Sequence, residues 1–120
     1  MRIESITMLH EMFVFHKKGS YVRPHKHLNK LESLLVIKGE LKLLIFDVKG
    51  RLLKTVEMGS FDSGKVCFYK MKKNFFHTQL IKKDTIFKEV TNGPFSKRKT
   101  LQATWSPKED MHKEIKKYLS

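Results

Sequence analysis

The sequence predicts an all-β fold, a small antiparallel β-barrel or sandwich that ends in one short helix. Short runs rich in aromatic and β-branched residues recur along most of the chain, as expected of strands. Turn signals separate these runs, a pattern typical of all-β barrels and sandwiches. The 120 residues, 40% of them hydrophobic, fit one domain, residues 1–120, with its own core.

The predicted strands are separated by turns that the sequence marks. Residues 47–51 form a predicted hairpin turn in which Gly50 is free to adopt a positive φ, and residues 58–64 form a predicted loop. The Gly-Pro pair at 93–94 ends the last long run. The strands expected from this pattern are 11–16, 21–27, 32–38, 41–48, 52–57, 65–70, 75–81, 85–90 and 98–105.

The C-terminal segment has helical signals instead. Ser106 and Glu109 have the spacing of a capping box, and Pro107 between them suits the first helical position. Apolar residues then recur at helical spacing at Met111, Ile115, Tyr118 and Leu119. We therefore expect a short helix over Pro107 to Leu119, packed on the outside of the β-domain, with Trp105 beneath it.

The chain carries a formal net charge of +13. Such a charge attracts nucleic acid, anionic lipid or phosphorylated ligands, but it also arises on a lysine-rich solvated surface. Only four basic residues are arginine, the favoured reader of phosphates and bases, and the lysines are spread along the whole chain. We therefore favour a solvated surface over a specific nucleic-acid interface.

Cysteine content and hydropathy set the expected compartment. The single cysteine, Cys67, excludes an internal disulfide, and its position in an apolar run predicts a buried and inert thiol. The sequence shows neither a signal peptide nor a run near the roughly 20 apolar residues of a membrane span. The expectation is a soluble, cytoplasmic protein.

Two histidines and a glutamate lie close together in residues 19–39. In an extended strand, His25 and His27 project from the same face, roughly 7 Å apart at about 3.3 Å per residue. A loop over 28–31 would let Glu32 begin the next strand and supply an oxygen ligand. A lone His-x-His pair is more often solvent-facing than metal-binding, so the interpretation needs support from the surrounding residues.

That support comes from the wider pattern of this stretch. Residues from Gly19 to Gly39 fit G-x5-H-x-H-x4-E-x6-G without a mismatch, and apolar runs follow. This pattern resembles the first sequence motif of the cupin superfamily. The resemblance implies a jelly-roll barrel, the double-stranded β-helix, with a metal held inside it by three histidines and one glutamate.

The third histidine is expected at position 77. The second cupin motif, G-x5-P-x-G-x2-H-x3-N, places its histidine at the head of a strand after a turn, as His77 is placed here. The rest of the motif is degenerate, with Lys72, Asn74 and Ile81 in place of its proline, second glycine and asparagine. The alternative for His77 is a hydrogen-bonded core histidine, and the remaining histidines are better explained as exposed: His10, His16 and His112.

Four further strings resemble the WbuC-type cupin fold metalloproteins of bacterial surface-polysaccharide (O-antigen) clusters. They occur in the family's order and span most of residues 18–110: 20–27, 76–78, 89–95 and 103–109. The resemblance implies a small β-barrel with one divalent metal ion and no established reaction. Imidazole and carboxylate ligands suit iron, manganese, nickel, copper or zinc, and the predicted ligands are His25, His27, Glu32 and His77.

Three residues are candidates for substrate binding. Arg23 shares the ligand face and would hold a carboxylate or phosphate, or else form a salt bridge at the rim. Tyr21 would donate a hydrogen bond into the barrel, or else pack there. Glu89 is the candidate acid or base of the pocket, with an exposed strand carboxylate as the alternative. No catalytic residue is assigned.

Three function classes are compatible with these features. The first is a metal-dependent enzyme that acts on a sugar or sugar nucleotide as an isomerase, epimerase or oxygenase. The second is a metal-bearing sugar-binding or sensor module without turnover. The third, a nucleic-acid binder, lacks an arginine-rich patch. We favour the first, with a small-molecule carbohydrate or sugar nucleotide as partner and a homodimer left open.

Overall fold

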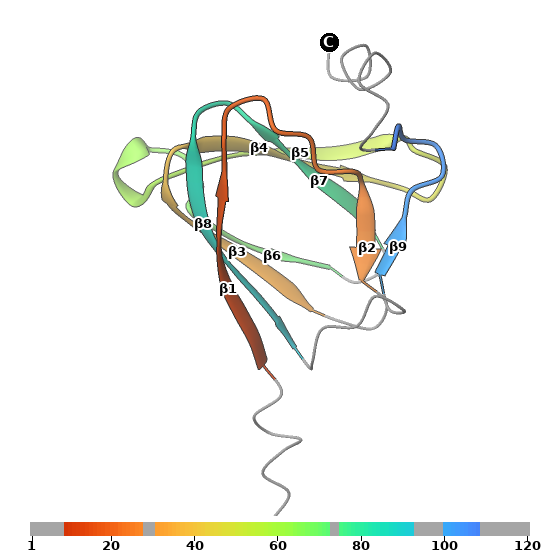
Figure 1. The fold of residues 1–120 in the computed structure, drawn as a ribbon, viewed down its shortest axis with the longest axis horizontal. Helices are drawn as coiled ribbons and strands as arrows, with labels where there is room; N and C mark the ends of the chain where they lie inside the picture. Colours follow the sequence, from red (N-terminus) through yellow and green to blue (C-terminus); the bar gives the residue numbers. More distant parts are fainter. Residues whose placement is uncertain (1–8, 28–30, 73–74, 93–99, 109–120) are drawn as a thin grey trace, which may run out of the picture.

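The computed structural model describes residues 9–27, 31–72, 75–92 and 100–108. Most of this part of the chain is in β-strands or in the turns between them (Figure 1). In chain order the elements are β1 (Leu9–His16), β2 (His25–His27), β3 (Glu32–Lys38), β4 (Glu40–Phe46), β5 (Leu52–Gly59), a 3₁₀ turn η1 (Phe61–Ser63), β6 (Phe68–Met71), β7 (Phe76–Ile81), β8 (Thr85–Asn92) and β9 (Thr100–Gln102).

The strands form two antiparallel sheets that face each other (Figure 1). One sheet has the order β1-β8-β3-β6, and the other has the order β5-β4-β7-β2-β9. Sequence neighbours such as β3 and β4 belong to different sheets, so the chain crosses repeatedly from one layer to the other. This arrangement is a jelly roll, and the predicted all-β antiparallel fold is confirmed.

The core fills the space between the two sheets, because alternate residues of each strand point inward. On β3, for example, Leu34 and Val36 are buried, whereas Leu35 and Ile37 are exposed. Each buried aliphatic side chain contributes roughly 1.5–3 kcal/mol of hydrophobic stabilisation. The main cluster draws on both sheets and consists of Leu34, Val36, Leu41, Leu43, Ile45, Val56, Met58, Met71, Ile81 and Phe87.

The crossing from β3 to β4 depends on Gly39. Its φ is +97°, in the region that L-residues with side chains rarely adopt. A Cβ at this position would overlap the Asp84 carbonyl oxygen and lie 2.7 Å from Thr85 Cα. The last glycine of the His-x-His stretch is therefore required where the chain turns from one sheet into the other.

A second apolar cluster covers the outside of the five-stranded sheet. Phe46, Phe76 and Ala103 are buried there, and the Trp105 ring packs against both phenylalanines, with centroids 4.9 and 5.7 Å away. The indole N–H donates to the Val48 carbonyl at 3.1 Å. Trp105 thus holds the segment after β9 against the hairpin between β4 and β5.

The outer face of the four-stranded sheet is lined by exposed apolar side chains. Phe13 is 70% exposed and Phe15 is 57% exposed, although both lie within the regular ladder of β1 and β8. The outward side chains of β3 and β6 continue the surface. We define this apolar face as Leu9, Phe13, Phe15, Leu35, Ile37 and Phe68.

Most predicted strands are found, and three differ clearly in extent. In the described part of the run 98–105, only Thr100–Gln102 is a strand. The run 21–27 is a strand only at His25–His27, with an isolated bridge between Tyr21 and Leu80 before it. Pro24 lacks the N–H that a ladder requires, which explains the interruption. The run 65–70 pairs as β6 only from Phe68 onward, because the Val66 and Cys67 carbonyls accept separate bonds from Gly59 and Val36.

The prediction for Cys67 is wrong in its burial. The thiol is half-buried, because Val66 and Phe68 beside it are exposed and this end of β6 is not covered. The predicted helix over Pro107 to Leu119 lies outside the described residues, which end at Lys108. In the described part of the chain, no helix is long and apolar enough to cross a membrane.

Candidate metal centre

The two sheets bring three of the four predicted ligands together at one end of the barrel. His25 on β2 lies directly opposite His77 on β7, and the ring centroids are 4.6 Å apart. β7 is held in turn by β4, where Ile45 is the partner of His77. Both histidines are therefore positioned by the ladder of the five-stranded sheet.

Glu32 reaches the same place from the other sheet. It is the first residue of β3, its side chain is 3% exposed, and its Oε2 lies 3.2 Å from His77 Nε2. The pair spans the gap between the layers and joins residues that are 45 positions apart in the sequence. His25 and Glu32 thus each contact His77, and the three residues come from three different strands.

The fourth predicted ligand is only partly described. His27 pairs with Thr100 of β9 in the ladder, and its side chain lies outside the described part of the structure. Among the described residues, no three histidine, cysteine or acidic side chains form a complete metal-ligand group.

These residues fit a divalent transition metal by their chemistry. His25 Nδ1 lies 2.9 Å from the Arg23 carbonyl oxygen, which can only accept a proton, so Nδ1 is the protonated nitrogen. The lone pair then resides on Nε2, and a ring N–H held by a backbone carbonyl is the usual support of a ligating histidine. Two imidazoles and a buried carboxylate suit borderline metals such as zinc or iron.

Glu89 completes the polar end of the barrel. It lies on the inner face of β8, diagonally across from Glu32, since Leu34 pairs with Glu89 and Glu32 pairs with Thr91. Burial, the charge of Glu32 and a hydrogen bond to it raise the pKa of Glu89 to about 8. Burial beside Glu32 therefore favours the protonated form of Glu89.

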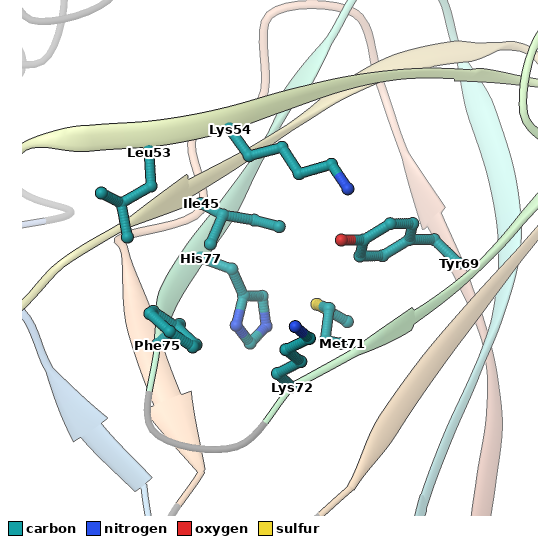
Figure 2. Close-up of a pocket in the computed structure, with 8 residues that line it drawn as sticks. All are labelled: Ile45, Leu53, Lys54, Tyr69, Met71, Lys72, Phe75 and His77. Carbon is teal, nitrogen blue, oxygen red and sulfur yellow. The ribbon is translucent and has the colours of Figure 1, made fainter.

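A cavity of about 170 Å³ opens beside His77 (Figure 2). Apolar side chains make most of its wall, and Figure 2 shows Lys54, Lys72 and the Tyr69 hydroxyl turned toward the same space as the His77 ring. The wall consists of Ile45, Leu53, Lys54, Tyr69, Met71, Lys72, Phe75 and His77. The candidate centre is thus reached from a small pocket with basic groups.

Solved structures with the same architecture include proteins of several kinds. A variant of Bacillus subtilis oxalate decarboxylase is 25% identical with a TM-score of 0.64, over 81% of this chain and 25% of that one. The 11S globulin procruciferin of Brassica napus is 13% identical with a TM-score of 0.62, over 76% of this chain and 22% of that one. A Shewanella oneidensis protein is 11% identical with a TM-score of 0.65, over 93% of this chain and 70% of that one.

These neighbours decide the fold family, because they are cupin-fold proteins and the strand arrangement matches theirs. This chain has the cupin fold. It spans about a quarter of the length of the oxalate decarboxylase chain. In sequence, a family model described as a domain of unknown function (DUF6016) matches residues 2–58. No curated protein sequence matches the chain.

In this cupin domain, Tyr21 and Arg23 contact the chain after β9. Arg23 Nη2 donates to the Ala103 carbonyl at 2.9 Å, and its Nε donates to Ser106 Oγ at 3.2 Å. The Tyr21 hydroxyl donates to the Pro107 carbonyl at 2.6 Å. Neither residue lines the cavity beside His77, so their role in substrate binding stays a prediction.

The sequence interpretation missed the cavity residues on β5 and β6. Lys54 faces inward because it pairs with Ile45, and it shares a face with Val56 and Met58. That alternation was a usable signal, since a lysine in register with buried residues marks a charge on the inner face. Tyr69 faces inward by the same rule, opposite Leu34.

Proposed function

We propose that this chain is a metal-binding cupin domain in which His25, His27, Glu32 and His77 hold one divalent ion. The main support for this proposal is the buried contact of Glu32 with His77 across the two sheets, with His25 directly beside His77. A divalent ion bound there would polarise an oxygen of a bound ligand as a Lewis acid. Iron, manganese, nickel, copper and zinc all suit this ligand set.

The residues of the chain around this centre would have separate tasks. The Arg23 carbonyl orients the His25 ring, and the apolar wall residues of the cavity would contact the apolar part of a ligand beside His77. The pKa of Glu89 is raised by burial beside Glu32, and Glu89 is the candidate acid or base. We propose that these groups serve an isomerase, epimerase or oxygenase acting on a sugar or sugar nucleotide, in bacterial surface-polysaccharide biosynthesis as in the WbuC-type family.

A second candidate is a metal-bearing binding or sensor module without turnover. One observation favours it: Tyr21 and Arg23, two of the three residues expected to work on a substrate, hydrogen-bond to residues 103–107 instead. Turnover on a panel of sugar nucleotides would separate the two candidates. Binding without any product under metal-loaded conditions would support the module.

Elemental analysis of purified protein tests the metal site itself. We expect about one divalent ion per chain in the wild type and severe loss in His27→Ala and His77→Ala. His16→Ala is the matched control. His16 is the last residue of β1, its ring packs beside Phe87 of β8, and it is not one of the proposed ligands. Equal metal content in His77→Ala and wild type would refute the assignment.

We propose that the apolar face of the four-stranded sheet is covered by a second copy of the chain. Soluble monomeric proteins rarely expose large contiguous apolar patches, and this face presents six exposed apolar side chains on three strands of one sheet. The face also carries Lys88 paired with Glu11 at 3.1 Å, so a two-fold partner would meet both signs of charge. Light scattering should give a dimer for the wild type and a monomer for Phe13→Ser; a monomeric wild type would contradict the proposal.

A further inference from the structure

We propose that the cavity beside His77 binds a small organic anion, a carboxylate or phosphate on a short apolar body, through Lys54 and Lys72. This inference rests on the proposed function, because it names the class of ligand for the same site. Four properties of the cavity carry it: the placement of each lysine, the balance of charge, the wall and the size.

The register of β5 places Lys54 on the same face of the strand as the buried Val56 and Met58, and Lys54 itself is exposed at the cavity. It stands opposite Ile45 of β4, whose side chain is buried and lines the cavity. Its Nζ lies 5.2 Å from the centroid of the Tyr69 ring, and this cation–π contact holds the ammonium over the cavity. The charge of Lys54 is therefore positioned by neighbouring residues.

Lys72 comes from the opposite sheet. It directly follows Met71, which is buried and pairs with Glu32 at the end of β6. Figure 2 shows the Lys72 ammonium turned toward the His77 ring, while Lys54 approaches from the other side of the same space. Two cations from two sheets thus flank the opening in front of the candidate metal centre.

The charges around the cavity are not balanced within the described part of the chain. No carboxylate is among the cavity's wall residues, and neither Lys54 nor Lys72 forms an ion pair with a described acidic side chain. Glu32 contacts Nε2 of the His77 ring and is not among the residues that line the cavity. An anion in the cavity would relieve the repulsion between the two ammonium groups and accept hydrogen bonds from both.

The wall and the size limit the rest of the ligand. Ile45, Leu53, Met71 and Phe75 offer apolar contact to a short hydrocarbon or ring. The cavity of about 170 Å³ is close to an apolar cavity of about 150 Å³ that holds benzene. It is smaller than the roughly 300–1,000 Å³ of most drug-sized sites, so a sugar nucleotide would place only its anionic end here.

The test is a calorimetric titration of zinc-loaded and metal-free protein with benzoate, phenyl phosphate and benzyl alcohol, which share one ring and differ in charge. We expect both anions to bind at least about tenfold more tightly than the alcohol, as one charge-assisted hydrogen bond supplies. Comparison of benzoate with phenyl phosphate separates a carboxylate site from a phosphate site. Equal binding of benzyl alcohol would overturn the proposal.

Lysine variants locate the effect. Lys54→Met and Lys72→Met keep the aliphatic stem, and each should weaken anion binding about tenfold, with about a hundredfold loss in the double variant. Lys54→Arg should restore most of the affinity, and Lys49→Met, an exposed lysine of the β4–β5 turn, should change it less than about twofold. Unchanged benzoate binding in the double variant would overturn the assignment.

Metal content separates this inference from the proposed function. The lysine variants should keep the metal that His77→Ala loses. Metal binding without any anion binding would sink the inference and leave the metal site standing. If instead the protein takes up no metal but still binds the anions, the anion site would stand and the proposed metal site would be wrong.

Discussion

The two ends of the barrel interior differ in chemistry although the same strands build both. Along β3 the inward residues run from Glu32 to Leu34 and Val36, and along β7 they run from His77 to Gln79 and Ile81. One end is therefore filled with aliphatic side chains, and the other collects imidazole, carboxylate and ammonium groups. The apolar end supplies stability, and the polar end contains the candidate metal centre.

This difference implies that stability and binding are separable by mutation. Burial of apolar area is the main favourable term in folding, and buried polar groups add little net stability beyond satisfying one another. Substitutions at the apolar end should therefore unfold the domain without a specific effect on metal. Substitutions at the polar end should remove metal with a smaller effect on folding.

The largest effect is expected for Leu43→Ala at the apolar end. Leu43 is fully buried, and truncation of such a residue costs about 2–5 kcal/mol in unfolding free energy. Urea denaturation would measure it, with Leu52→Ala, 55% exposed, as a control expected within about 0.5 kcal/mol of wild type. If Leu43→Ala also released metal from folded protein, the two ends would not be independent.

At the polar end, His77→Ala should lower metal affinity by about a hundredfold or more, since even supporting residues of metal sites contribute about 10- to 100-fold. Competition with a chelator would measure the affinity, and urea denaturation of metal-free protein would measure the stability. A loss of stability as large as that of Leu43→Ala would show that His77 is chiefly a core residue, the alternative kept open for it.

Gly39→Ala tests the corner that closes the apolar end. The added Cβ meets the Asp84 carbonyl and forces an L-residue to a φ of +97°, so we expect a loss of about 1–3 kcal/mol. Gly64→Ala is matched to it, because Gly64 has a φ of +80° with open space around its Cβ position. Equal losses in both variants would mean that backbone strain alone, without the steric overlap, explains Gly39.

The smallest expected effect is the loss of stability in acid that comes from Glu40, at the rim of the apolar end. Hydrogen bonds from Lys65 and Lys83 lower the pKa of Glu40 to about 2, with ion-pair distances of 2.6 and 2.7 Å. A depressed carboxyl pKa stabilises the fold above the unfolded pKa of 4.5, and this contribution is lost as pH falls toward about 2. The pair is solvated and screened, so the effect is small.

Thermal unfolding of wild type and Glu40→Gln between pH 6 and pH 2 would measure this contribution. The two proteins should differ in melting temperature at pH 6 and converge in acid, because protonated Glu40 has lost its charge. A constant difference across the range would exclude the Glu40 ion pairs as its cause.

Local pattern was enough to predict much of the fold and to select residues for the candidate site. The run 32–38 was predicted as a strand and is one, and Gly50, expected to be free to adopt a positive φ in the turn at 47–51, adopts it there. The spacing of His25 and Glu32 reflects the end of β2 and the first residue of β3. These features depend on contacts within a few residues, which is why a single sequence contains them.

Only the tertiary structure decided which distant residues meet. Glu32 touches His77 across two sheets, and Arg23 binds Ala103 and Ser106 some 80 positions away, where the sequence had suggested a ligand-facing side chain. Cys67 is half-buried because burial depends on what covers a strand, and Lys54 faces inward because of its partner Ile45. Strand periodicity states that a residue has a face, whereas pairing and layer packing determine what that face contacts.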